Sequence, residues 1–514
     1  MKYLQALKYA YSFCVFGFQG ELSSSAKKRM EELFEKGVSG FIFFKRNIKS
    51  FSDAEVLYDF CEKRNNKLFT MIDQEGGRSV QLPSEVFRGL NQMAYTAVNS
   101  KDIIGISGEF MASDLKRYGI NTLLGPVVDV NSEYTNPIIG IRSFSDDEET
   151  VAQNAYEFCK GVRSNGVRTV LKHFPGHGPV NVDSHKALPE CSMKSDELFE
   201  VHIKPFKRLI ESGSADMIMS AHIKYSEIDT LPASLSKRFL CDILRDELCF
   251  EGITITDCLE MNAISENFDI PKAAVLALKN GNDLILISHT EKTQLDTVKA
   301  IAREIFEGGI DKSVVKGKYE RIEKMKSTKL KRERRDVFLT ESHKDRWEKE
   351  LVEKSIFRIN TDNTWKAKRE LDLIAVKNDD FGSASVNCFY GEFYERISKI
   401  VKTNYFLIDF QDIESASLNF EFANRKDCIF ISDCRGVFQS RKISEFFNKK
   451  LIDYKYKIVL SISDPYDYTL LENYDEYYAL FGCAKYSAET FLDFLIRGKT
   501  NNSVFPLKKY KKEA

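Results

Sequence analysis

Eight short apolar runs recur through the first 290 residues of this 514-residue chain, and this repetition restricts its possible folds more than any other feature. Polar residues bound each run, as expected of a parallel strand that is buried on both faces. Segments with helical spacing separate the runs, among them residues 25–36, 101–118, 151–165 and 195–212. The runs are residues 13–18, 39–44, 68–72, 120–124, 169–171, 217–220, 252–256 and 283–287. Strand and helix alternating eight times predict an α/β fold, a (β/α)8 barrel of the TIM type.

A second, smaller α/β unit is predicted after the barrel. Residues 311–356 are charged and helix-favouring, and we interpret the basic run at 331–335 as part of a solvated connector. Apolar runs then resume at 371–376, 405–410, 428–432 and 457–462, with helical intervals such as 443–451 and 487–497. We therefore predict a catalytic barrel domain over residues 1–335, a helical connector over 336–355 and a C-terminal α/β domain, αβα sandwich-like, over 356–514. This last domain has one polar loop after a strand, at 463–467, and is interpreted as structural or at most substrate-binding.

Composition excludes several classes of partner. Lys and Arg number 75 against 76 Asp and Glu, so no basic field is present to bind nucleic acid. No run approaches the roughly 20 apolar residues that span a membrane. Eleven cysteines without a C-x-x-C pair indicate reduced thiols. Residues 1–20 could pass for a short signal peptide, but Lys8 interrupts the apolar run and no cleavage signal follows. We predict a cytoplasmic protein.

Polar and ionisable residues follow the predicted strands, where a barrel of this type carries its chemistry. The segments in question are residues 45–47, 73–78, 129–131, 172–173, 221–222, 257 and 288–289. A polar loop is ordinary by itself, but that explanation accounts for one or two of these segments and not for the whole set.

Three of the chain's seven histidines fall between His173 and His185. A metal site is disfavoured, because Pro175 and Gly176 preclude the helix on which an i, i+4 histidine pair usually binds zinc. In an extended segment, Asp183 and His185 face the same way, so the carboxylate can hold one ring nitrogen and leave the other to transfer a proton. This pair is therefore a candidate general acid/base, with a surface-loop histidine as the alternative.

Asp257 ends the seventh run, where a carboxylate can attack a substrate or stabilise a cation. Its alternative role is to cap the following helix. Side chains of the kind that bind sugar hydroxyls surround it in the predicted barrel mouth, although each could instead form a buried salt bridge. They are Asp73, Arg142, Lys172, His173 and His222.

Taken together, these residues resemble glycoside hydrolase family 3, and within it the β-N-acetylglucosaminidase branch. The matching segments are IDQEGGR at 72–78, GPVVDVN at 125–131, NPIIGIRSF at 136–144, KHFPGHG at 172–178 followed by DSH at 183–185, SAH at 220–222, PASLS at 232–236 and TDCLEM at 256–261. The resemblance implies that Asp257 is the nucleophile and that His185, with Asp183 as its partner, is the acid/base. It also implies that Asp73, Arg142, Lys172 and His173 bind the non-reducing-end sugar.

The chain departs from the family pattern at three places. An arginine that usually follows Arg78 closely falls on Gln81 here, so one sugar contact is altered. The Asp-Thr that often follows the Gly-His-Gly is replaced by Pro179-Val180, and Cys258 stands where a second Asp is common after the nucleophile. These departures affect fine specificity more than the chemistry.

The resemblance implies retaining hydrolysis of a terminal β-linked N-acetylglucosamine, and this reaction needs no metal or organic cofactor. The resemblance points to peptidoglycan fragments in cell-wall recycling as the substrate. Three alternatives stay open: phosphorolysis, because a histidine acid/base does not repel phosphate; β-glucosidase activity; and a glycan-binding protein without turnover.

Overall fold

The first part of the chain folds into a barrel of eight parallel strands. The computed structural model describes residues 1–63, 67–83, 86–184, 186–328, 330, 341–359, 365, 370–377, 384–413, 426–434, 436–499 and 501–510. The barrel strands are β1 (Cys14–Gly17), β2 (Gly40–Phe43), β3 (Phe69–Ile72), β4 (Thr122–Leu123), β5 (Arg168–Phe174), β7 (Met217–Ser220), β9 (Ile253–Thr256) and β10 (Ile285–Ile287). Their order is β10-β1-β2-β3-β4-β5-β7-β9, and a parallel bridge between Ile255 and Leu284 brings β9 beside β10. The predicted TIM-type barrel is confirmed.

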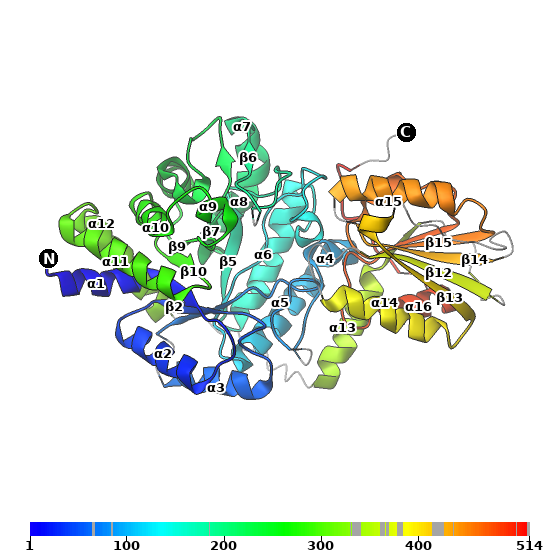
Figure 1. Cartoon of the computed structure of the whole chain (residues 1–514), viewed down its shortest axis with the longest axis horizontal. Coiled ribbons are helices and arrows are strands. Elements are labelled where there is room, and N and C mark those ends of the chain that lie inside the picture. Colours follow the sequence, from blue (N-terminus) through cyan, green and yellow to red (C-terminus); the bar gives the residue numbers. More distant parts are fainter. Residues whose placement is uncertain are drawn as a thin grey trace.

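Helices surround these strands (Figure 1). They are α1 (Tyr3–Ser12), α2 (Ser24–Glu35), α3 (Phe51–Glu62), α4 (Gln92–Val98), α5 (Lys101–Arg117), α6 (Glu148–Ser164), α7 (Ser195–Glu197), η2 (Leu198–Ile203), α8 (Lys204–Glu211), η4 (Arg238–Glu247), α9 (Asn262–Ser265), α10 (Ile270–Lys279), α11 (Glu291–Glu307) and α12 (Lys312–Ser327). Local sequence fixes several of their starts. At α3, for example, the Ser50 hydroxyl accepts the N–H of Asp53 while the Asp53 carboxylate accepts the N–H of Ser50, a capping box that satisfies two exposed donors.

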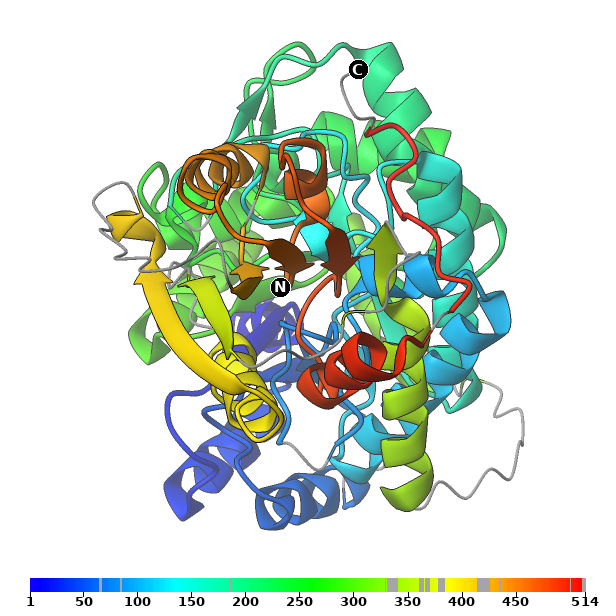
Figure 2. The same cartoon turned by 90° about the vertical axis from the view of Figure 1, so that its right-hand side faces the viewer.

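The second domain is a six-stranded sheet with helices on both faces (Figures 1 and 2). Its strands are β11 (Phe357–Ile359), β12 (Glu370–Lys377), β13 (Lys402–Asp409), β14 (Asp427–Ser432), β15 (Tyr456–Ser461) and β16 (Glu476–Ala479), in the order β11-β16-β15-β14-β12-β13. Among the described strands of this sheet, only β11 pairs antiparallel. Helices α14 (Ala384–Ile397) and α16 (Ser487–Arg497) lie on one face, and α15 (Gly436–Lys450) lies on the other (Figure 1). The predicted C-terminal α/β sandwich is confirmed.

Helix α13 (Glu341–Ser355) and the last described residues of the chain connect the two domains. On α13, Glu348 accepts the backbone N–H of Arg88 at 2.7 Å. The carboxylate of Asp146 accepts the backbone N–H groups of residues 508, 509 and 510 at 2.7, 2.8 and 2.8 Å, which fastens this segment to the barrel. Residues 336–340 of the predicted connector lie outside the described residues, and the domain boundaries at 335 and 355 stay predictions.

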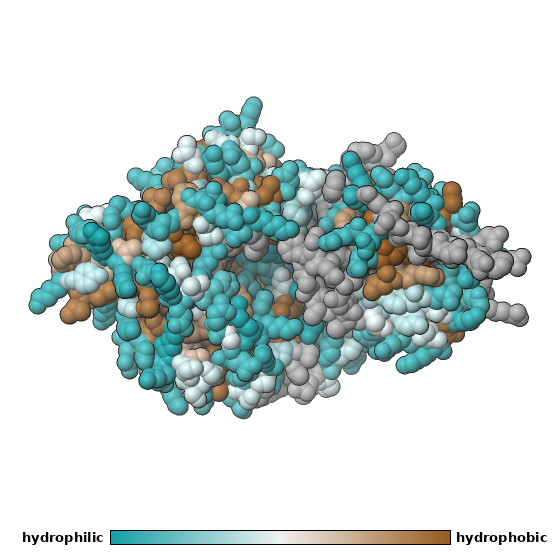
Figure 3. Space-filling view, viewed as in Figure 1, coloured by the Kyte–Doolittle hydropathy of each residue, from teal (hydrophilic) through white to brown (hydrophobic). Residues whose placement is uncertain are grey.

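No described helix has the length and apolar character needed to cross a bilayer. On the face seen in Figure 3, hydrophilic residues predominate and hydrophobic ones are scattered among them. All ten cysteines whose side chains the structure describes carry unbridged thiols.

Candidate active site

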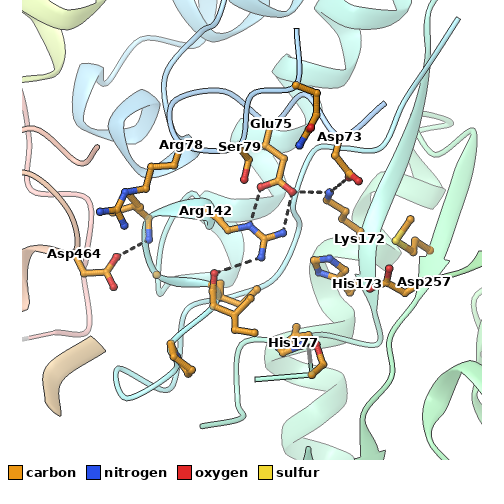
Figure 4. A pocket seen from close by; sticks show the side chains of 18 residues that line it. Asp73, Glu75, Arg78, Ser79, Arg142, Lys172, His173, His177, Asp257 and Asp464 are labelled. Atoms are coloured by element: carbon orange, nitrogen blue, oxygen red, sulfur yellow. Dashed lines mark hydrogen bonds and ion pairs between the residues drawn. The ribbon is translucent and has the colours of Figure 1, made fainter. Parts of the chain in front are cut away.

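A cavity of about 310 Å³ opens at the carboxyl ends of the barrel strands, next to the second domain (Figure 4). Its volume lies near the lower end of the range for ligand pockets, roughly 300–1,000 Å³, and suits a ligand the size of one sugar ring. Its lining comes from the loops after β3, β4, β5 and β9, from the strands β5 and β7, and from the second domain. The lining residues are Asp73, Glu75, Arg78, Ser79, Gln81, residues 137–142, Lys172, His173, His177, Ser184, Met219, Asp257 and Asp464.

Two acidic and two basic side chains form a continuous network along one wall of the cavity (Figure 4). Lys172 Nζ lies 2.7 Å from Asp73 Oδ1 and 2.6 Å from Glu75 Oε1. The guanidinium of Arg142 binds both oxygens of Glu75, with Nε and Nη2 each at 2.8 Å. A bidentate pair of this kind fixes the orientation of both partners. The network therefore presents charged hydrogen-bonding groups to the cavity in one defined arrangement.

The charges of this network are fixed by mutual attraction. Burial alone would raise the pKa of Glu75, but Arg142 and Lys172 outweigh burial and hold the pKa well below its ordinary value. Burial would lower the pKa of Lys172, but Asp73 and Glu75 raise it above its ordinary value. The carboxylate and the ammonium therefore stay ionised across the neutral range.

We expect Glu75→Gln to lower the free energy of unfolding at neutral pH by about 3 kcal/mol or more, the scale of removing one partner from a buried ion pair. The folded-state pKa of Glu75 is depressed, so its stabilisation is present above the ordinary pKa of 4.5 and is lost as the pH falls toward the folded-state value. Urea unfolding at several pH values checks this: the difference between wild type and variant should shrink in acid. Glu149→Gln, which removes an ion pair of Lys204 with Glu149 half exposed, is the control and should cost no more than about 1 kcal/mol. A pH-independent difference at Glu75 would contradict the assignment.

A buried carboxylate orients the first histidine of the KHFPGHG segment. Asp129 Oδ2 lies 2.8 Å from His173 Nδ1, and Oδ1 accepts the backbone N–H groups of His173 and His177 at 3.2 and 2.5 Å. These contacts fix the imidazole of His173 at the cavity wall. His177 Nε2 lies 3.1 Å from the Ser184 hydroxyl, and burial, followed by the nearby His173, lowers the pKa of His177 to about 4. His177 is therefore neutral near pH 7.

Asp257 stands at the mouth of the barrel, one residue after β9. It lines the cavity, and its Oδ1 accepts the backbone N–H of Cys258 at 2.7 Å. In Figure 4 it lies beside His173 and across the cavity from Asp464. The strand end thus delivers a partly exposed carboxylate to the bottom of a sugar-sized cavity, where it can approach a bound ligand.

The structure brings six of the predicted site residues together in the cavity lining: Asp73, Gln81, Arg142, Lys172, His173 and Asp257. Gln81 also accepts the backbone N–H of Lys45 at 3.1 Å through Oε1. Asp183 is buried and is not part of this lining, although the neighbouring Ser184 is. His185 lies outside the described residues.

His222 is not brought to the cavity lining. It is 1% exposed, with Nδ1 2.7 Å from the Ser234 hydroxyl and Nε2 3.0 Å from the carbonyl oxygen of Cys258. The described contacts of His222 therefore support the backbone that follows Asp257, and its predicted contact with the sugar stays a prediction.

Four residues of the site were not among the predicted site residues: Glu75, His177 and Asp464, which line the cavity, and Asp129, which holds His173 from behind the lining. Glu75 stands two residues after Asp73, and Asp129 follows the fourth predicted strand. Their position directly after a strand was therefore the sequence feature that could have identified them as site residues. Asp464 belongs to the polar loop noted in the second domain, but no local pattern relates that loop to the barrel.

Among the described residues, Cys258, Glu260 and His289 place potential metal ligand atoms within 4.8 Å of one another. Both oxygens of Glu260 already accept backbone N–H groups, from His289 at 2.6 Å and Thr290 at 2.8 Å. Burial raises the pKa of the Cys258 thiol to about 12, so the thiol stays protonated, and Arg46 Nη2 lies 3.2 Å from His289 Nδ1. A neutral thiol and a nearby guanidinium disfavour a bound cation, and we interpret this group as a support for the loop after β9.

Comparison with known proteins adds an independent line of evidence. A family described as "Glycosyl hydrolase family 3 N terminal domain" matches residues 14–325. The chain is 35% identical over 265 residues to a protein named beta-hexosaminidase from Hydrogenovibrio crunogenus, covering 50% of this chain and 73% of that protein. It is 34% identical over 283 residues to a beta-hexosaminidase from Thioalkalivibrio sulfidiphilus, covering 53% and 80%. A solved family 3 beta-N-acetylglucosaminidase from Paenibacillus sp. superposes with a TM-score of 0.83 at 25% identity, covering 97% of this chain and 98% of that one.

Proposed function

The chain belongs to glycosyl hydrolase family 3 and is a glycosidase, and we propose that it is an exo-acting, retaining enzyme that releases terminal β-linked N-acetylglucosamine. One observation carries the proposal: Asp257 lines a cavity the size of one sugar ring together with a network of charged hydrogen-bond donors and acceptors. A cavity of this volume favours release of a single terminal sugar. The beta-hexosaminidase relatives support a 2-acetamido sugar.

In the proposed mechanism Asp257 is the nucleophile. Its carboxylate attacks the anomeric carbon while His185 donates a proton to the departing glycosidic oxygen, and a covalent glycosyl-enzyme forms. His185, now neutral, then takes a proton from water, and the resulting hydroxide displaces Asp257 with net retention. Asp183 is proposed to hold the imidazole in the orientation that both steps need.

The charged network is proposed to bind the sugar. Asp73 and Arg142 offer an acceptor and donors to ring hydroxyls, and Lys172 and His173 contribute further donors from β5. Gln81 takes the place of a family arginine and offers a neutral amide instead. The carboxylates and cations of the network are paired with one another, so the empty site holds no uncompensated charge. It can therefore bind a neutral sugar, which brings no charge of its own.

We propose bacterial peptidoglycan fragments as the natural substrate and the cytoplasm as the place of action. Peptidoglycan contains β-linked N-acetylglucosamine, and the relatives named beta-hexosaminidase come from bacteria. The unbridged thiols of the described cysteines support a reducing compartment. Cell-wall recycling is the corresponding physiological role.

Product analysis by mass spectrometry tests the function directly. Purified protein is incubated with nitrophenyl β-N-acetylglucosaminide and, separately, with the matching β-glucoside, each with and without phosphate. We expect free N-acetylglucosamine from the first substrate alone, in both buffers. Glucose release at a comparable rate would contradict the specificity, and a sugar 1-phosphate in phosphate buffer would identify phosphorolysis. No product from either substrate would favour a glycan-binding protein.

A further inference from the structure

The second domain contributes a carboxylate to the cavity wall. Among the described lining residues, Asp464 alone comes from this domain, and its side chain is buried. It lies between β15 and the short helix η7 (Pro465–Thr469). Figure 4 shows Asp464 on the side of the cavity away from Asp257, with its carboxylate directed toward the barrel loop at residues 137–142. The cavity wall is therefore built by both domains.

Asp464 accepts a hydrogen bond from the backbone next to Arg142. Its Oδ1 accepts the N–H of Ile141 at 2.9 Å, across 323 residues of sequence. Ile141 belongs to the short 3-10 helix η1 (Gly140–Arg142). The last residue of η1, Arg142, binds Glu75 through its guanidinium. A hydrogen bond from a buried N–H to a charged acceptor is among the stronger hydrogen bonds in proteins. The second domain thus fixes the backbone one residue before a sugar-site arginine.

Gly140 shows how closely the carboxylate approaches this turn. Its φ is +39°, and a Cβ at this position would lie 2.3 Å from Asp464 Oδ1 and 2.6 Å from Oδ2. Any side chain here would have to displace either the turn or the carboxylate. The lack of a side chain at Gly140 therefore leaves the space that the Asp464 carboxylate of the second domain occupies.

A second contact holds the Asp464 loop against the barrel. Arg78 Nη2, from the loop after β3, lies 2.5 Å from Asp433 Oδ1 and also donates to the Ser463 hydroxyl. Asp433 is 1% exposed, whereas Arg78 is partly exposed and lines the cavity, so the ion pair lies at the cavity wall with its carboxylate buried. The N–H of Asp464 donates to the carbonyl oxygen of Cys434 at 3.2 Å, which ties Asp464 to the same strand end. The carboxylate is thus held by its own loop as well as by the turn.

We propose that Asp464 is a positioning residue of the sugar-binding site: it holds the η1 turn so that Arg142, locked to Glu75, meets the sugar in a fixed orientation. The inference rests on the proposed function for the identity of the ligand. The positioning itself is a property of the folded chain and can be measured without substrate. It makes the second domain a part of the active site.

Substrate kinetics test the proposal. Asp464→Ala should raise KM for nitrophenyl β-N-acetylglucosaminide roughly 10-fold or more with a much smaller change in kcat, because contacts made equally to the substrate and the transition state affect KM. Asp464→Asn keeps an oxygen acceptor for the Ile141 N–H and should restore KM to within about threefold of wild type. Lys508→Ala is the control, since it removes an ion pair with Asp147 (2.9 Å) that lies outside the cavity lining.

Hydrogen exchange separates this inference from the proposed function. The peptide covering residues 137–142 should exchange roughly 10-fold faster in Asp464→Ala than in wild type and at the wild-type rate in Lys508→Ala, whether or not the enzyme cleaves the substrate. Unchanged exchange in Asp464→Ala would overturn the inference even in an active enzyme. If Asp464→Ala exchanged faster but the wild-type protein released no sugar, the positioning role would be retained and the proposed function rejected.

A double-mutant cycle completes the test. Gly140→Ala should raise KM at least as much as Asp464→Ala, because its methyl group would meet the carboxylate and because a φ of +39° strains any side chain. In the double variant the clash is absent although the backbone strain remains, so the increase in KM should be smaller than the product of the two single increases. Additive effects, or an Asp464→Asn variant as impaired as Asp464→Ala, would show that the contact between carboxylate and turn is not what matters.

Discussion

Replacing Asp257 with alanine should lower kcat/KM for nitrophenyl β-N-acetylglucosaminide by at least about 10⁴-fold, the scale expected for loss of a catalytic nucleophile. The expected result follows from its place at the end of β9, where the carboxylate lines the cavity. No other described carboxylate on this side of the cavity can substitute for it without disturbing the network, because Asp73 and Glu75 are engaged by Lys172. Steady-state kinetics on the purified variant provide the measurement.

A chemical rescue distinguishes a nucleophile from a merely structural residue. Azide added to Asp257→Ala can enter the space that the carboxylate leaves and attack the anomeric carbon, which would yield a glycosyl azide of inverted, α configuration. Asp246→Ala, at an exposed position outside the cavity lining, is the matched control and should keep wild-type kinetics. Rescue that gives the β-azide, or a loss below about 10²-fold, would point to a different nucleophile.

The barrel could be predicted from the sequence because its signal is local. Each strand is a short apolar run buried on both faces, and the described strands lie within the predicted runs or differ from them by a few residues at the ends; β7 coincides with residues 217–220. The exception is β5, which continues through Lys172 and His173 to Phe174. Polar residues suggested an earlier end, but Lys172 pairs with the buried Glu75 as well as with Asp73, and His173 pairs with the buried Asp129.

Two strands of the second domain escaped prediction. β11 has three residues at the sheet edge, too few for a periodic signal, and β16 lies in a segment rich in Tyr and acidic residues. Neither segment shows the apolar run that marked the other strands. Pairing with β15 gives β16 its strand conformation, and this pairing is a property of the assembled sheet.

The site was only partly predictable, because its decisive contacts join distant parts of the chain. Lys172 and Asp73 are 99 residues apart, and Ile141 and Asp464 are 323 apart. Position after a strand identified which side chains reach the barrel mouth. It could not show that Glu75 is the centre of the charged network or that the polar loop at 463–467 closes the cavity wall, since both depend on tertiary packing.

The proposed acid/base makes a prediction that depends on the leaving group. His185→Ala should lower kcat/KM for an unactivated N-acetylglucosaminide, such as the methyl glycoside, by about 10²–10⁴-fold, because the departing oxygen then leaves without a proton. A nitrophenolate leaves readily as the anion, so kcat/KM for nitrophenyl β-N-acetylglucosaminide should stay within about tenfold of wild type. A plot of log kcat/KM against leaving-group pKa should therefore be steeper for the variant than for wild type.

The second half of the reaction provides a further readout on the same variant. Without a base to activate water, the glycosyl-enzyme formed from the nitrophenyl substrate should accumulate, and intact-protein mass spectrometry should detect a mass increase of one N-acetylhexosaminyl residue. His343→Ala, an exposed histidine on α13, is the control and should show neither effect. If His185→Ala lost activity equally on both substrates with no covalent species, the histidine would act in positioning or folding, and the proton would have to come from another group. Asp183→Asn tests the proposed partner separately: a partner of the acid/base should share the leaving-group dependence expected of His185→Ala, whereas a structural carboxylate should lower both rates alike.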